Sequence, residues 1–326
     1  MIVVTGGAGF IGSNIVAALA ARGEEVAVCD RLGRGDKWRN LAKHLIAEIV
    51  APNELARFLA GLGSVRAVIH MGAVADTTET DADLIADSNF SLSLRLWNWC
   101  AGQDVPLIYA SSAATYGDGS AGFSDDNDPA ALARLRPLNA YGWSKHAFDR
   151  RVIDLVARGA AHPPQWAGLK FFNVYGPNEY HKGEMRSVVV KNYAAAAAGE
   201  PVRLFRSHRA DYQDGGQMRD FVHVRDCVAV VLWLLDHGEV SGIFNVGSGQ
   251  ARSFHDLIAA LFDATGHAPV IEYGDMPAGL RAKYQYFTQA DLGRLRAAGY
   301  CAPPTPIEEG VAHYVREYLS QPDPFL

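Results

Sequence analysis

The chain has 326 residues, of which 49% are apolar and 20% are charged, and its formal net charge is −6. These values are typical of a globular protein with two domains or one large α/β domain. A mildly acidic chain lacks the basic surface that nucleic-acid binding requires, and no segment has the roughly 20 apolar residues that span a bilayer. The first residues form a strand rather than a basic leader, and the four cysteines show no zinc-type spacing. We therefore expect a cytoplasmic protein without a metal, a nucleic-acid partner or a membrane partner.

The first half of the chain alternates short β-branched runs with helical patterns. These runs predict buried parallel strands at 2–5, 25–30, 67–71, 107–110 and 169–172, with helices at 11–21, 53–62, 82–100 and 141–157. Beyond residue 174 we expect a loop, a helix at 186–198, a strand at 202–205, a polar segment at 208–217 and an amphipathic helix at 307–319. A strand at 243–246 is apolar enough to return to the main sheet. The predicted fold is α/β: a Rossmann-type doubly wound parallel sheet over 1–173 and, mainly in 174–326, a smaller substrate-binding lobe.

A glycine-rich turn links the first predicted strand to the first helix, at Gly6, Gly9 and Gly12. Such glycines permit a tight turn, a close approach of the backbone to a pyrophosphate and close helix–strand packing. The free N–H groups at the helix N-terminus favour an anion. The motif therefore predicts a bound dinucleotide.

The residue that ends the second strand, Asp30, suits an adenosine ribose hydroxyl and so favours NAD. Three cations follow it: Arg31, Arg34 and Lys37. Guanidinium and ammonium groups suit the 2′-phosphate of NADP, although they could equally be solvated loop charges. We expect NADP, with NAD as the alternative.

Candidate catalytic residues follow the fourth strand and begin a helix. Ser111 and Ser112 lie at the strand's carboxyl end, and Tyr141 and Lys145 share one helix face because they are four residues apart. A phenol with a pKa of about 10 is a poor base, but a neighbouring ammonium and a nicotinamide cation would stabilise the phenolate. We predict that Tyr141 transfers the proton, that Ser112 binds the same substrate oxygen, and that Lys145 also holds the nicotinamide ribose.

Three segments resemble the extended short-chain dehydrogenase/reductases: TGGAGFIG at 5–12, SSAATYG at 111–117 and YGWSK at 141–145. Others resemble the ADP-L-glycero-D-manno-heptose 6-epimerase family more narrowly: FFNVYGPNE at 171–179, HKGEM at 181–185, RDFVHVRD at 219–226, YQYFTQADL at 284–292 and LRAAGY at 295–300. This resemblance implies an isomerase that interconverts ADP-D-glycero- and ADP-L-glycero-D-manno-heptose at C6 through transient oxidation by bound NADP. It also implies a role in supplying heptose to the lipopolysaccharide inner core, and a homo-oligomer, often a pentamer.

The resemblance further implies a second acid/base group, because epimerisation handles protons on two sides of one carbon. In the family a lysine of the HKG segment serves opposite the tyrosine, and here it matches Lys182. Burial and neighbouring cations can lower the pKa of an amine enough for this role. The alternative is a loop charge that pairs with the diphosphate or with Glu184.

Matching the family position by position implies two sets of contacts. The cofactor set is Phe10, Ile11, Asp30, Arg31, Lys37, Met71, Gly72, Ala73, Val74, Ala75, Asn89, Lys145 and Val174. The nucleotide-sugar set is Ser112, Asn173, Glu184, Lys191, Phe205, Arg206, Ser207, His208, Arg219 and Tyr284. The planar fork of Arg219 suits a diphosphate, whereas Tyr284 could equally be a core aromatic.

The chain departs from the family pattern at several positions. Glu184 stands where many members carry a small hydroxyl residue, Lys191 replaces a histidine of some members, and segment 208–217 carries extra residues. Residues 51–52 lie where some relatives have a cofactor-contacting lysine.

Two alternative functions share much of this pattern. An epimerase or dehydratase acting on another UDP-, GDP- or dTDP-sugar would share the cofactor half. Residues 113–114 are both alanine, where dehydratases place an acid pair, which disfavours elimination. A non-catalytic NADP-binding protein would not need Ser112, Tyr141 and Lys145 together.

Overall fold

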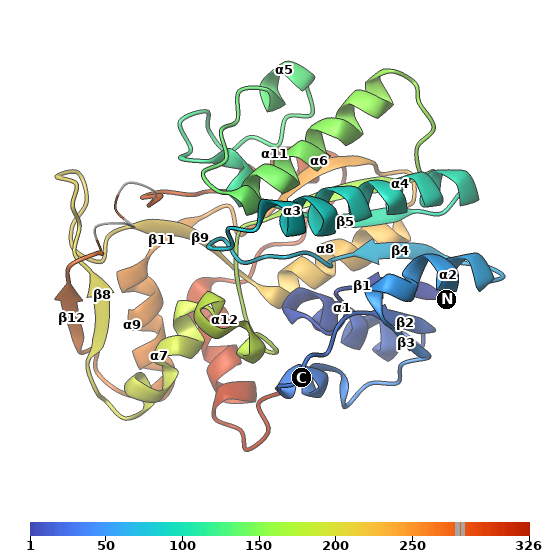
Figure 1. The fold of residues 1–326 in the computed structure, drawn as a ribbon. Helices are drawn as coiled ribbons and strands as arrows, with labels where there is room; N and C mark the ends of the chain where they lie inside the picture. Colours follow the sequence, from blue (N-terminus) through green and yellow to red (C-terminus); the bar gives the residue numbers. More distant parts are fainter. Residues whose placement is uncertain (278–280, 282–283) are drawn as a thin grey trace.

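The computed structural model describes residues 1–277, 281 and 284–326 of the chain. Its largest element is a seven-stranded sheet in the order β3-β2-β1-β4-β5-β6-β10, in which every neighbouring pair is parallel (Figure 1). The strands are β1 (Ile2–Thr5), β2 (Val26–Cys29), β3 (Glu48–Val50), β4 (Ala67–His70), β5 (Leu107–Ser112), β6 (Trp166–Phe171) and β10 (Gly242–Val246). The strand order reverses between β1 and β4, and doubly wound sheets bind ligands at such a switch point. The predicted Rossmann-type fold is confirmed.

Helices cover both faces of this sheet. One face carries α2 (Leu55–Gly61), α4 (Leu92–Gln103) and α6 (Ala140–Ala157), and the other carries α1 (Phe10–Ala21) and α8 (Val224–Asp236). Burial on both faces explains why the strands are continuous apolar runs. Asn139 caps α6 by accepting a hydrogen bond from the Gly142 N–H, so Tyr141 lies in the first helical turn.

The C-terminal lobe lies beside the sheet (Figure 1). It contains the pair β8 (Val202–Phe205) and β12 (Ile271–Gly274), and the sheet of β7 (Asn173–Tyr175), β9 (Met218–His223) and β11 (Ala251–Ser253). Helices α7 (Val188–Ala197), α9 (Phe254–Thr265) and α12 (Ile307–Tyr314) pack around its own apolar core. The predicted division at residue 173 is crossed twice, because α8 and β10 return to the large sheet.

The expected elements are mostly present, with differences that have physical causes. The predicted helix 82–100 is divided into α3 (Ala82–Ile85), a π-helical stretch (Ala86–Ser91) and α4. The return of residues 243–246 to the main sheet is confirmed by the pairing of β10 with β6. Helix α8 and strand β9 were not predicted from the sequence, although α8 has 13 residues and its buried positions recur at a helical spacing, both of which favour a helix over a strand.

Candidate active site

A cavity of about 660 Å³ opens at the carboxyl ends of the strands, between the sheet and the lobe. This volume suits a ligand of moderate size. The cavity wall brings together predicted residues that are far apart in the sequence: Gly6, Gly9, Phe10, Ile11, Gly12, Asp30, Lys37, Met71, Gly72, Ala73, Ala75, Ser112, Tyr141, Lys145, Asn173, Val174, Lys182, Arg219 and Tyr284.

The glycine-rich turn leaves the start of α1 open to the cavity. Gly9 is the N-cap residue, it has no side-chain capping bond, and the first turn carries no acidic residue. Gly6 has a φ of +66°, and a Cβ atom on Gly12 would overlap the Gly6 carbonyl oxygen. Free N–H groups at a helix N-terminus bind anions, so the turn fits the pyrophosphate of a dinucleotide.

The carboxylate of Asp30 is held by three donors. It accepts hydrogen bonds from the Ala8 N–H at 2.9 Å, from the Arg31 N–H at 2.7 Å and from the Lys37 ammonium at 2.7 Å. The Lys37 ion pair neutralises its charge, and both groups line the cavity. The carboxylate is therefore far less repulsive toward a nearby phosphate than an unpaired one would be.

The Tyr141 phenol and the Lys145 ammonium share one region of the cavity. Lys145 Nζ donates to the Ala110 carbonyl oxygen at 2.8 Å, and burial lowers its pKa to about 8. Burial raises the pKa of Tyr141 above its usual value, and its hydrogen bond with Ser112 offsets only part of this rise. The predicted Ser–Tyr–Lys group therefore converges beside the glycine-rich turn.

Lys182 reaches the same cavity from a short 3-10 helix, η5 (Tyr180–Met185), in which Gly183 has a φ of +54°. Its ammonium lies 5.1 Å from the centre of the Phe10 ring. Burial lowers the pKa of Lys182, and Glu179 acts in the opposite direction. Glu184 pairs with Lys191 at 3.0 Å instead, so it is not the partner of Lys182.

A nearly buried cation, Arg219 on β9, forms another part of the wall. It is 7% exposed, and its guanidinium carbon lies 5.0 Å from the Tyr284 ring centre and 5.7 Å from that of Phe254. No acidic side chain of the described residues contributes to its pKa, which burial lowers. A buried cation without a carboxylate favours an anionic ligand. Tyr284 therefore lies on the cavity wall over Arg219.

The remaining predicted contacts lie outside this wall: Arg31, Val74, Asn89, Glu184, Lys191, Phe205, Arg206, Ser207 and His208. Asn89 is fully buried, and it exchanges hydrogen bonds of 2.8 and 2.9 Å with the Val74 backbone. It therefore supports the loop that follows β4. Phe205 borders the site, with its ring centre 6.4 Å from that of Tyr284.

The wall also contains Ser111, which the sequence placed at the end of its strand with Ser112, and it contains residues that were not predicted: Thr77, Ala110, Phe171, Phe172, Tyr175, His181, Met185, Arg186, Ser187, Val188, Phe221, Phe254 and Leu257. Many of them adjoin the quoted FFN and HKGEM segments. Taking each whole segment as wall would have found those.

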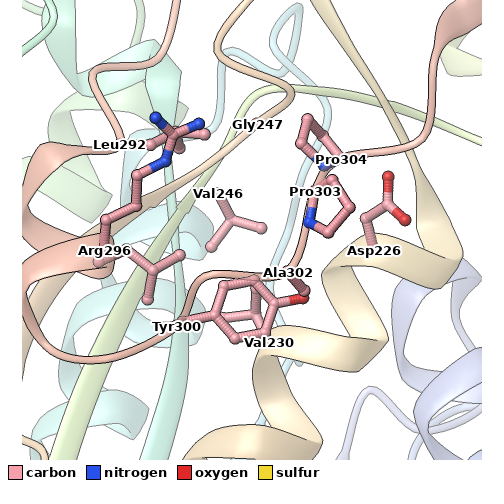
Figure 2. A pocket seen from close by; sticks show the side chains of 11 residues that line it. Asp226, Val230, Val246, Gly247, Leu292, Arg296, Tyr300, Ala302, Pro303 and Pro304 are labelled. Atoms are coloured by element: carbon pink, nitrogen blue, oxygen red, sulfur yellow. The ribbon is translucent and has the colours of Figure 1, made fainter.

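A second hollow lies among α8, the end of β10 and residues 292–304 (Figure 2). Its volume of about 20 Å³ holds about one water molecule, too little for a substrate. Within the described residues, no cluster of three or more His, Cys, Asp or Glu side chains could hold a metal ion. None of the described helices is long and apolar enough to cross a membrane.

A doubly wound sheet whose switch point opens into such a cavity is an architecture in which nicotinamide-dinucleotide enzymes bind their cofactor. The chain belongs to the NAD dependent epimerase/dehydratase family, whose sequence profile matches residues 2–247.

Relatives and solved structures resemble the chain over nearly its whole length. The ADP-L-glycero-D-manno-heptose-6-epimerase of Nitratidesulfovibrio vulgaris strain DP4 is 50% identical, with 100% of both chains covered. The Fusobacterium nucleatum protein of that name is 44% identical over the same shares. The solved Helicobacter pylori ADP-L-glycero-D-manno-heptose-6-epimerase has a TM-score of 0.78 at 28% identity, covering 97% of this chain and 95% of that one. A Thermus thermophilus UDP-glucose 4-epimerase in complex with NAD has a TM-score of 0.75 at 29% identity, covering 96% and 97%.

Proposed function

We propose that this protein is an ADP-L-glycero-D-manno-heptose 6-epimerase that interconverts the two configurations at C6 of ADP-heptose. The observation that carries the proposal is that two proton-transferring side chains, Tyr141 and Lys182, line one cavity with the buried Arg219. Full-length relatives with this name support the choice of substrate.

The cofactor we propose is NADP. A bound nicotinamide dinucleotide supplies the hydride acceptor and the hydride donor of such an epimerisation. The preference for NADP is supported by the Lys37–Asp30 ion pair at 2.7 Å and by the exposed Arg31 and Arg34 beside it. Lys37 neutralises the Asp30 carboxylate, which would otherwise repel the 2′-phosphate of NADP. The planar guanidinium groups of Arg31 and Arg34 can donate hydrogen bonds to that phosphate.

Tyr141 and Lys182 divide the proton transfers between them. One of them removes the proton from the C6 hydroxyl as the C6 hydrogen leaves as hydride. The resulting carbonyl then presents its other face, and the second group returns a proton to its oxygen as hydride comes back to C6. The two groups must therefore start in complementary states, one protonated and the other not.

The surrounding residues bind and orient the substrate. Ser112 donates a hydrogen bond to the reacting oxygen, and Lys145 holds the cofactor ribose while its positive charge favours the phenolate. Arg219 clamps the diphosphate, whose charge compensates the buried guanidinium. We further propose a homo-oligomer, with a pentamer as the expected state, which light scattering tests.

The direct test incubates purified protein with ADP-D-glycero-D-manno-heptose, without added cofactor, and follows the C6 configuration by proton NMR. We expect an equilibrium mixture of both epimers, and NADP in the extract of the denatured protein. If ADP-heptose stays unchanged while a UDP- or GDP-sugar is converted, the proposal that ADP-heptose is the substrate is wrong.

Two variants test the pair of acid/base groups. Tyr141→Phe and Lys182→Met should each lower kcat by about 100-fold or more, because each removes one proton-transferring group. Lys43→Met is the matched control, since Lys43 pairs with Asp323 outside the cavity. Near-normal epimerisation by Lys182→Met would place the second base elsewhere.

A further inference from the structure

A buried carboxylate that the proposed chemistry does not use lies next to the reacting groups. Asp149 follows Lys145 by one helical turn, so Tyr141, Lys145 and Asp149 are spaced along one face of α6. It forms an ion pair with Lys170 at 2.7 Å, and both side chains have 0% exposure.

This ion pair connects the elements that carry the reacting groups. Asp149 accepts a hydrogen bond from the Ser111 hydroxyl at 2.6 Å and one from Tyr109 at 3.2 Å, both on β5. Lys170, on β6, also donates to Thr115 at 2.7 Å, in the turn after β5. Strand β5 ends in Ser112 and presents the carbonyl that holds Lys145.

Stability is a weak explanation for such a pair. Removing two charges from water costs about as much as their attraction returns, so apolar replacements of buried pairs are often neutral. What the pair does supply is a fixed charge pattern close to the acid/base site. Burial raises the pKa of Tyr141 and lowers that of Lys145, and the charge of Asp149 acts to raise both. The Lys170 ammonium lies 2.7 Å from this carboxylate and offsets its charge.

We propose that Asp149 and Lys170 are a positioning pair, in which the carboxylate locks α6 against β5 and the ammonium cancels its charge so that the phenol can ionise. The inference rests on the proposed acid/base role of Tyr141. Neither Asp149 nor Lys170 lines the cavity, so neither is proposed to contact substrate or cofactor.

Other ionisable groups lie around Tyr141, and their charges bear on the test. Lys145 and Asp149 come from α6, Lys170 from β6 and Lys182 from η5. On β4, burial and the charge of Lys145 lower the pKa of His70 to about 3, so it is neutral near pH 7. On α6, burial and Lys170 likewise lower the pKa of His146 to about 4. Among these groups, Asp149 and the three lysines carry the charges.

The experiment compares pH profiles of kcat for the holoenzyme with those of Asp149→Asn and Lys170→Gln. Both amides keep hydrogen-bonding capacity and remove one charge. One limb of the kcat–pH profile reports the ionisation of Tyr141. Asp149→Asn should move this limb to lower pH, and Lys170→Gln should move it to higher pH, each by about half to one pH unit. The double variant should return within a few tenths of a unit of the wild type.

Thr115→Val is the matched control, because it removes a hydrogen bond of Lys170 but keeps both charges. It should leave the limb in place. Shifts of the two charge variants in the same direction, or lower kcat without any shift, would overturn the proposal.

If a charge variant does not fold, Tyr109→Phe decides, because it removes a hydrogen-bond donor that partly offsets the negative charge of the Asp149 carboxylate itself, which Thr115→Val does not. It should move the limb upward by a few tenths of a unit, and an unmoved limb would overturn the proposal. A fully active Tyr141→Phe would instead overturn the proposed function.

Discussion

The glycine-rich turn allows a prediction whose size follows from the coordinates. In Gly12→Ala, the new Cβ would overlap the Gly6 carbonyl oxygen and lie 2.8 Å from its carbon and 3.0 Å from the Gly7 Cα. All three atoms are backbone, so the helix and the turn must separate. Overpacking of this kind costs about 1–3 kcal/mol of unfolding free energy, or roughly 1.5–4.5 °C in Tm for a chain of 326 residues.

The displacement also moves the N–H groups that would bind the pyrophosphate. Losing one charge-assisted hydrogen bond, worth about 1.5–3 kcal/mol, weakens dinucleotide binding by about 10- to 100-fold. Calorimetric titration with NADP and the amount of dinucleotide that copurifies measure this effect. Gly102→Ala is the matched control, because Gly102 lies in α4 with nothing within 4 Å of its Cβ position. That control should gain up to about 1 kcal/mol of stability. A Gly12→Ala protein whose Kd for NADP stays within about twofold of the wild-type value would refute the assignment of the glycine-rich turn as the pyrophosphate site.

Two further predictions concern the substrate clamp and the buried histidines. Arg219→Met should raise KM for ADP-heptose by about 10- to 100-fold, because the diphosphate loses a charge-assisted partner; an unchanged KM in steady-state kinetics would remove Arg219 from the site. Burial lowers the pKa of His70 and of His223 from 6.5 to about 3, so below pH 6.5 the unfolded chain binds protons that the folded protein does not. The unfolding free energy should therefore be complete above pH 6.5 and fall by up to about 1.4 kcal/mol per pH unit for each histidine as the pH drops toward 3. Urea unfolding between about pH 7 and pH 5 measures this slope. The variant His223→Asn should have a smaller slope, whereas the control His255→Asn, at an exposed position, should keep the wild-type slope. Equal slopes in wild type and His223→Asn would contradict this explanation.

The parts of the site that were predictable are local in the chain. Gly6, Gly9 and Gly12 act through the dihedral angles and packing of one turn. Tyr141 and Lys145 share a face because of the helical period alone. Neither inference needs to know what packs against the segment.

The relations between segments could not be derived in this way. Lys182 lies over Phe10, Arg219 lies over Tyr284, and Asp149 pairs with Lys170. These contacts join residues that are 172, 65 and 21 positions apart, so they depend on how elements distant in the sequence pack together. The family resemblance pointed to Lys182 and Arg219, but nothing in the sequence pointed to the Asp149–Lys170 pair.

The same distinction explains the secondary structure. Residues 2–5 are β-branched and are followed by glycine, so the local sequence favours a strand there. The length of segment 224–236 and the spacing of its buried residues favour a helix, whereas its packing against α1 depends on the tertiary structure. The sequence by itself determined the dinucleotide turn, the Tyr141–Lys145 pair and the alternation of strands and helices, since these depend on neighbours along the chain. The tertiary structure decided which distant charges share the cavity, because burial and electrostatic coupling exist only once the chain is packed.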